Sequence, residues 1–289
     1  MLSWTETLFY PIFLAQIALI SWYLPGRMSA HMSAALEKYP PDQYPKLYPQ
    51  SVDRYIIGQW RYRLVNNAIA IVGLVVVGLM LFVVDHSTFA DDGFISEAWP
   101  AFYGMLQFLP LLFLEFSASG QMKLMRENNE STKRSADLQP RRLFDYVSPR
   151  LLLVAVIAAL AAFTFEMALH DFVWSVERLQ RLAILLLVNS FFLAIGYTLL
   201  RGRKPDPYQS SEDRARLVRR NLRSLLFTSV AISVFAVYQS LDSVYAIDYL
   251  DAVMMSLYFQ VVAALSFGYL LHGQLTDDAD FEVYRDASA

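Results

Sequence analysis

The chain has 289 residues, of which 56% are hydrophobic and 18% are charged, and its mean hydropathy is +0.34. Soluble domains carry charge on about a quarter of their residues, so this apolar excess excludes an ordinary soluble protein and indicates a membrane protein. The net charge of −3 argues against nucleic-acid binding, and the absence of cysteine excludes disulfides, thiolate metal sites and a cysteine nucleophile.

Seven apolar runs divide the chain, and each is long enough to cross a bilayer as a helix. Because the bilayer interior offers no water to backbone groups, the spans should be helical, and the sequence lacks the alternating pattern of a transmembrane β-barrel. The predicted fold class is therefore an all-α polytopic transmembrane helix bundle. Its spans are expected at about residues 8–24, 64–84, 99–120, 151–169, 182–200, 225–241 and 253–271.

The segment after the first span is rich in prolines and aromatic residues. Pro25-Gly26 predicts a break or kink, after which residues 28–38 can form a short surface helix. Residues 39–49, YPPDQYPKLYP, are expected to be extended and stiff, because each proline removes a donor and restricts the residue before it. This segment, named here the Tyr-Pro strap, either lies rigidly across the membrane face or serves as a docking strip for a partner. Residues 51–63 predict an interfacial helix that leads into the second span.

The positive residues alternate strongly between the connections. The first, third and fifth connections hold six, seven and eight of the 24 Lys and Arg residues, whereas the second and sixth hold none. Since cytoplasmic loops carry the excess of Lys and Arg, these three connections are predicted to be cytoplasmic, with the N-terminus outside and the C-terminus inside. The expected location is a cell inner membrane, whose anionic lipid headgroups are the predicted partners of the basic loops.

Three local patterns complete the predicted organisation. Small residues at 155, 158, 159 and 162 in the fourth span predict a face on which a neighbouring helix packs closely. Ser210 or Ser211, followed by two acidic residues, predicts the start of a helix that leads into the sixth span. Residues 1–272 are expected to form one transmembrane domain, and residues 273–289 an acidic, mobile cytoplasmic tail.

Polar side chains inside the spans are the candidates for function, because each is costly in lipid unless it faces a cavity or a partner. They occur toward the predicted cytoplasmic side at Asn66, Asn67 and Glu115, near the middle at Asn189 and Gln260, and toward the outside at Glu166, Gln239, Asp242 and Asp251. Five of them are predicted to line a polar path through the bundle, with the two glutamates as proton or cation sites at opposite depths: Glu115, Glu166, Asn189, Gln260 and Asn67.

A structural role is the alternative for the same residues. The amides can hold helices together through interhelical hydrogen bonds, and Glu115 can pair with Arg63 or Arg150 at the cytoplasmic interface. For Glu166 the sequence offers no positive residue at its predicted depth. Both interpretations stay open at the level of sequence.

Two histidine-carboxylate pairs end spans on the predicted outer side. Asp85-His86 follows the second span and His170-Asp171 the fourth, and these residue types are suitable ligands for zinc. Their spacing matches no metal motif, and polar residues are common where a helix leaves the membrane. We therefore predict no metal site and no cofactor, and keep these four residues only as weak candidates.

The sequence contains no recognisable catalytic signature, such as HExxH, GxSxG or a Walker-type glycine loop. An enzyme that uses Glu166 and Asp171 stays a minor alternative, and the main prediction is a protein without catalytic activity. Two functions are then weighed. One is a small transporter or channel with the polar path; the other is a membrane scaffold or sensory subunit, binding a cytoplasmic partner through its basic loops and the Tyr-Pro strap. A homo-oligomer or a membrane-complex partner is compatible with both.

Overall fold

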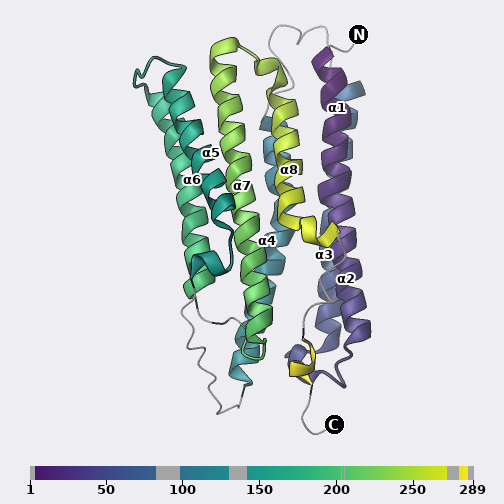
Figure 1. Ribbon diagram of the computed structural model, residues 1–289. Helices are drawn as coiled ribbons and strands as arrows, with labels where there is room; N and C mark the ends of the chain where they lie inside the picture. Colours follow the sequence, from purple (N-terminus) through teal and green to yellow (C-terminus); the bar gives the residue numbers. More distant parts are fainter. Residues whose placement is uncertain are drawn as a thin grey trace.

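The computed structural model describes residues 4–82, 98–129, 142–202, 204, 206–271 and 280–285. Within these ranges all regular structure is helical, and seven helices are long and apolar enough to cross a membrane. The long helices run side by side, with the first described residues at one end of the bundle and residues 280–285 at the other (Figure 1). The predicted multi-pass, all-helical fold class is confirmed to this extent.

Each predicted span corresponds to one long helical segment. The first combines α1 (Trp4–Gln16), the π-helix η1 (Ile17–Tyr23) and α2 (Leu24–Lys38), and the others are α3 (Val52–Phe82), α4 (Ala98–Glu127), α5 (Pro149–Ala168), α6 (Val176–Arg201), α7 (Ser211–Tyr245) and α8 (Asp251–Leu271). Short 3-10 helices lie between and after them: η2 (Pro45–Leu47), η3 (Leu143–Asp145), η4 (Asp248–Leu250) and η5 (Glu282–Tyr284).

Most helices extend beyond the apolar runs that predicted them. The interfacial helix expected at residues 51–63 is the first part of α3 rather than a separate element. The predicted helix start before the sixth span is confirmed, because the Ser210 hydroxyl accepts a hydrogen bond from the Asp213 amide, 3.1 Å away, and so caps α7. A helix can continue past the lipid boundary because its hydrogen bonds are local to the backbone.

Of the break or kink predicted at Pro25-Gly26, the break is wrong. The chain passes without interruption from η1 into α2, and the Leu24 amide donates to the Leu19 carbonyl in the wider pattern of a π-helix. Proline normally clashes with the carbonyl one turn earlier, and a wide turn just before it is one way to accommodate the ring without ending the helix.

The helices form two groups that meet along α7 and α8. In the first group, α1, η1, α2, α3 and α4 pack around one another and against α8; in the second, α5 and α6 pack against α7 (Figure 1). The predicted small-residue face of α5 lies in this second group, where Ala155 and Ala162 are buried against α7. Small side chains there let the two backbones approach closely.

The outside of the bundle is covered by large apolar side chains. Leu74, Phe113, Leu187 and Phe191 are more than half exposed, and they come from three different helices, α3, α4 and α6. A water-soluble protein rarely exposes so continuous an apolar surface, so lipid is the solvent that fits it.

One end of the bundle, named here the basic end, is where α2, α4 and α6 end and α3, α5 and α7 begin (Figure 1). Part of the tail predicted to be mobile lies here. Residues 280–285 contact both the Tyr-Pro strap and the beginning of α7: the Phe281 ring stacks on Tyr39 with centroids 4.0 Å apart, and the Asp280 amide donates to Asp213. The charge of this acidic stretch predicted a mobile tail, but its aromatic residues make apolar contacts with the rest of the protein. Residues 272–279 and 286–289 lie outside the described residues.

Candidate functional site

Glu166 lies in the last turn of α5, at the end of the bundle opposite the basic end, and only 3% of its surface is exposed. Within the described residues neither of its carboxylate oxygens has a hydrogen-bond partner. A buried carboxylate normally accepts several hydrogen bonds, so this one is unusual and is the first candidate for a functional group.

Arg181 of α6 supplies the charge that the sequence did not offer to Glu166. Its Nη1 lies 3.7 Å from Glu166 Oε1, at ion-pair distance but without a hydrogen bond between the two. The expectation that no positive residue reaches the depth of Glu166 is therefore wrong. Because α6 begins at Val176, Arg181 belongs to the helix rather than to the connection, and its long side chain reaches across to α5.

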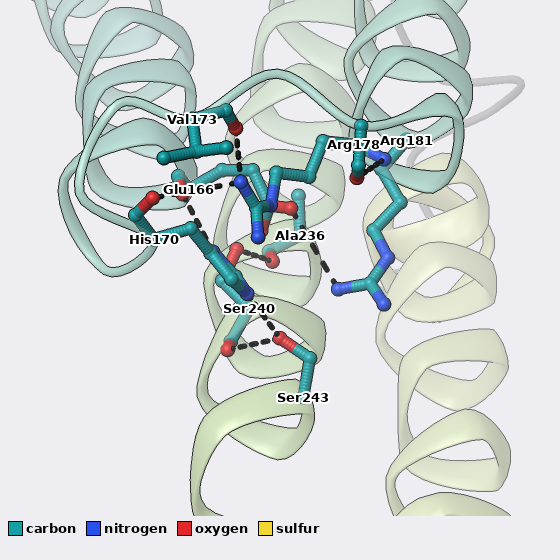
Figure 2. Close-up of polar contacts among 9 residues, drawn as sticks. Glu166, His170, Val173, Arg178, Arg181, Ala236, Ser240 and Ser243 are labelled. Carbon is teal, nitrogen blue, oxygen red and sulfur yellow. Dashed lines mark hydrogen bonds and ion pairs between the residues drawn. The ribbon is translucent and has the colours of Figure 1, made fainter.

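Further polar groups surround this pair (Figure 2). Asp242 of α7 is within electrostatic reach of Arg181, and one of its carboxylate oxygens is buried without a hydrogen bond in the described structure. Arg178 Nη1 donates to the carbonyl of Val173, in the connection between α5 and α6. We refer to five residues as the α5–α7 cluster: Glu166, His170, Arg178, Arg181 and Asp242.

His170 makes a polar contact with each of its ring nitrogens. Nδ1 lies 2.9 Å from the Glu166 carbonyl oxygen, and Nε2 lies 3.2 Å from the Ser243 hydroxyl of α7 (Figure 2). The chain turns sharply just after it, where Asp171 and Phe172 adopt left-handed backbone conformations with φ of 53° and 57°. The histidine ring thus lies between the end of α5 and α7.

The weak metal candidates are not brought together by what the structure describes. Asp85 and His86 lie outside the described residues, both nitrogens of His170 contact the protein itself, and Asp171 is exposed. Among the described residues no group of three or more potential metal ligands occurs.

A second candidate site is a cavity of about 450 Å³ at the basic end, between α4, α7 and α8. We name it the arginine cavity. Its lining combines charged, polar and apolar side chains: Glu115, Arg216, Arg219, Arg220, Asn221, Arg223, Ser224, Phe227, Leu265, Ser266 and Phe267. The arginines recur every three or four residues along α7, which is the spacing that places side chains on one side of a helix.

Glu115 is the one carboxylate among the described residues that line this cavity. It forms no ion pair with Arg63 or Arg150 in the described part of the chain, and these were the partners that the structural alternative offered. Arg216 is paired with Asp213, at 2.5 Å, just outside the cavity. With three further arginines in the lining, positive charge exceeds negative charge, and the cavity is suited to an anion.

The predicted amides of the polar path lie apart from both sites. Asn189 accepts a hydrogen bond of 2.5 Å from Ser229 and thereby joins α6 to α7. Gln260 of α8 donates to the Ile12 carbonyl of α1, 3.0 Å away. Asn67 is exposed on the surface of α3. The five path candidates thus occupy five different surroundings, and Glu115 and Glu166 belong to sites at opposite ends of the bundle.

A network of buried polar groups was missed by the sequence reasoning. Gln16 Nε2 donates to Gln107 Oε1 at 2.9 Å, Gln107 Nε2 donates to the Ser21 hydroxyl at 2.8 Å, and Ser256 donates to Gln16 Oε1 at 2.6 Å. All four side chains are at most 1% exposed. The network connects α1, η1, α4 and α8, and its mutual hydrogen bonds mark it as interhelical bonding. A glutamine inside an apolar run was the available signal, as it was for Gln260.

Comparisons of the chain with protein-family models, with curated proteins and with solved structures find no match. The function is therefore argued from the chemistry of the α5–α7 cluster and the arginine cavity.

Proposed function

We propose that this multi-pass membrane protein is a carrier that binds an anionic substrate in the arginine cavity and moves it across a cell (inner) membrane. The observation that carries the proposal is that four arginines of α7 line a space of about 450 Å³ between three of the apolar helices. Small-molecule sites usually have volumes of roughly 300–1,000 Å³. Guanidinium groups bind carboxylate and phosphate oxygens through paired, charge-assisted hydrogen bonds.

The lining also favours a substrate with an apolar part. Phe227, Leu265 and Phe267 lie in the same lining as the arginines, so one ligand can contact cationic and apolar walls together. An organic acid or an alkyl phosphate has both an anionic group and an apolar part, whereas a free inorganic anion has only the anionic group.

The arrangement of the helices supports a carrier more than a channel. The cavity lies where α7 of one helix group meets α4 and α8 of the other. In carriers built from two helix groups, the substrate site lies between the groups, and rocking of one group exposes it alternately to the two sides. Near the middle of α6 and α8, Asn189 and Gln260 are bonded to neighbouring helices and do not line the cavity.

The scaffold alternative requires an accessible Tyr-Pro strap. In the structure the Tyr44 hydroxyl donates to Glu282, 3.0 Å away, and Lys46 Nζ donates to the Arg285 carbonyl at 2.8 Å. The chain's own tail therefore occupies part of the strap that a partner would have to bind. This favours the carrier over the scaffold.

Replacement of Arg219 and Arg223 by glutamine tests the proposal. We expect the double variant to bind octyl phosphate at least about tenfold more weakly than the unchanged protein, because a hydrogen bond to a charged group contributes about 1.5–3 kcal/mol. Binding is measured by calorimetry in detergent, and transport by the uptake of labelled octyl phosphate and inorganic phosphate into proteoliposomes.

Arg54→Gln is the matched control, because Arg54 is an exposed arginine of α3 outside the cavity lining. It should bind and transport like the unchanged protein. Binding of neither probe to the unchanged protein, or equal loss in the control and the double variant, contradicts the anion site. A third outcome is that the double variant loses binding but the unchanged protein takes up neither probe. The protein would then be an anion receptor, and the carrier proposal would be rejected.

A further inference from the structure

The protonation state of His170 follows from the atoms that its ring contacts. The partner of Nδ1 is the backbone carbonyl oxygen of Glu166, which can only accept a hydrogen bond. Nδ1 must therefore carry a hydrogen. The carbonyl belongs to the last turn of α5, where backbone oxygens lack partners within the helix, so the imidazole side chain caps the helix end.

The partner of Nε2 is the hydroxyl of Ser243, which has only one hydrogen to donate. That hydroxyl also lies 2.8 Å from the Ser240 carbonyl oxygen, another group that can only accept. If the hydroxyl hydrogen is donated to Ser240, then Nε2 must donate to the Ser243 oxygen. All three contacts are hydrogen bonds together only when both ring nitrogens carry hydrogen, which is the imidazolium form.

We propose that His170 is a proton-binding site, and that the bound proton joins the end of α5 to α7. The proton comes from the aqueous phase at the end of the bundle opposite the basic end, where His170 is half-buried. It adds to Nε2, which then donates to Ser243. When the proton leaves, the Ser243 hydroxyl donates its one hydrogen either to Nε2 or to the Ser240 carbonyl. One of the two hydrogen bonds is then lost.

Charges on every neighbouring element act on this proton. The neighbouring carboxylates are Glu166 on α5 and Asp242 on α7, and a negative charge or the negative end of the α5 dipole would favour the proton. Arg178 and Arg181 of α6 oppose it. Arg178 is held by backbone carbonyls, including that of His170 itself at 3.5 Å, and Arg181 by Glu166.

Two exposed carboxylates add to the side that favours the proton. Asp171 follows His170 in the chain, and Asp248 lies in η4, between α7 and α8. Histidine is the side chain whose ordinary change of charge falls between pH 5 and 8.

Nitrogen NMR of the full-length protein in detergent micelles tests the proposal, with ¹⁵N in the histidine rings. The signal of His170 is the one missing from His170→Gln. We expect imidazolium shifts on both ring nitrogens at pH 6.5, and loss of the Nε2 hydrogen as the pH rises. A neutral His170 ring at pH 6.5 would overturn the proposal.

The variant Ser243→Ala tests whether His170 is protonated because of its hydrogen bond to Ser243 or only because its ring is exposed to water. Removing the acceptor of the Nε2 hydrogen should reduce the share of imidazolium at His170 at pH 6.5, since a hydrogen bond to a charged group contributes about 1.5–3 kcal/mol. The matched control is Thr228→Ala, because Thr228 also bonds to a carbonyl of its own helix, that of Ser224, and lies far from the α5–α7 cluster. An unchanged share of imidazolium in Ser243→Ala contradicts the proposed link. No substrate is needed, so the result does not depend on whether the protein is a carrier.

Discussion

Glu166 and Arg181 form an ion pair with a buried carboxylate, a partly exposed arginine and no hydrogen bond between them. Their closest atoms are 3.7 Å apart, the carboxylate is almost fully buried, and the arginine side chain is 37% exposed. Desolvation of a buried carboxylate costs several kcal/mol, and only good geometry with additional hydrogen bonds offsets it. Since those hydrogen bonds are missing among the described residues, we expect the pair to add little stability while each partner still depends on the other.

A double-mutant cycle at this pair makes that expectation measurable. Arg181→Leu leaves Glu166 buried without its counter-charge and should lower the free energy of unfolding by about 1–2 kcal/mol, less than the 3–5 kcal/mol of a fully buried pair because Arg181 is partly solvated. Adding Glu166→Leu should restore at least half of the loss. Unfolding is followed by circular dichroism in mixed micelles, and Arg54→Leu serves as the exposed control. A double variant less stable than Arg181→Leu would show that the pair itself stabilises the fold.

At the scale of the element, close helix contacts depend on glycines. A Cβ atom built on Gly104 of α4 would lie 2.6 Å from ring atoms of Phe259 on α8, whereas one built on Gly120 of the same helix meets nothing within 4 Å. The aromatic ring of α8 therefore packs directly against the backbone of α4. Only the first glycine is required by packing.

Alanine substitutions at these two positions separate packing from helix propensity. Gly104→Ala should destabilise the protein by about 1–3 kcal/mol, because the Phe259 ring must move to avoid overpacking. Gly120→Ala should be neutral or stabilise by up to about 1 kcal/mol, since alanine favours a helix more than glycine. Both are measured by the same unfolding experiment. Equal effects at the two positions would mean that α4 and α8 are not in close contact at Gly104.

The existence and order of these elements could be predicted from the sequence, but their ends and partners could not. An apolar run reports the part of a helix that lipid covers, and this locates the sixth span at residues 225–241. The helix itself begins at Ser211, because the basic residues between them form the same backbone hydrogen bonds as the apolar ones. Hydropathy carries no information about that continuation.

The candidate sites were predictable only in part, for a related reason. Glu166 stands out in an apolar run, but its partner Arg181 comes from another helix, and the sequence alone does not say that the two helices adjoin. Gln107 looks like Gln260 in sequence, a single amide among apolar residues. Its inclusion in the buried network with Gln16 depends on which faces of α1 and α4 meet, and tertiary packing decides that.

At the scale of the whole molecule, the tail connects the two helix groups at the basic end. Tyr284 is buried and donates to Asp206, in the connection before α7, while Glu282 accepts from Tyr44 of the Tyr-Pro strap after α2. Burial and the hydrogen bond to Asp206 raise the pKa of Tyr284, and the hydrogen bond to Glu282 raises the pKa of Tyr44. Because protonated phenols are the donors, these contacts persist below the ordinary tyrosine pKa of about 10 and weaken only above it.

The side of the membrane on which this basic end lies can be tested directly, because the chain contains no cysteine. Introduced cysteines are then the only targets for a membrane-impermeant thiol reagent. Glu177→Cys and Tyr249→Cys change exposed residues at the end opposite the basic end, and Lys123→Cys and Glu212→Cys change exposed residues at the basic end. Since positive residues concentrate in cytoplasmic loops, we expect labelling of the first two in intact cells.

The other two cysteines should be labelled only after the cells are opened, and labelling of all four in lysed cells is the control for reactivity. The reverse pattern would place the arginine cavity on the outer side and His170 on the cytoplasmic side. In that case the proposed anion site would open to the exterior, and the proton proposed for His170 would come from the cytoplasm. Labelling of Glu177→Cys and Lys123→Cys from the same side would contradict the threading of α4 and α5 through the membrane, because these residues lie at opposite ends of the bundle.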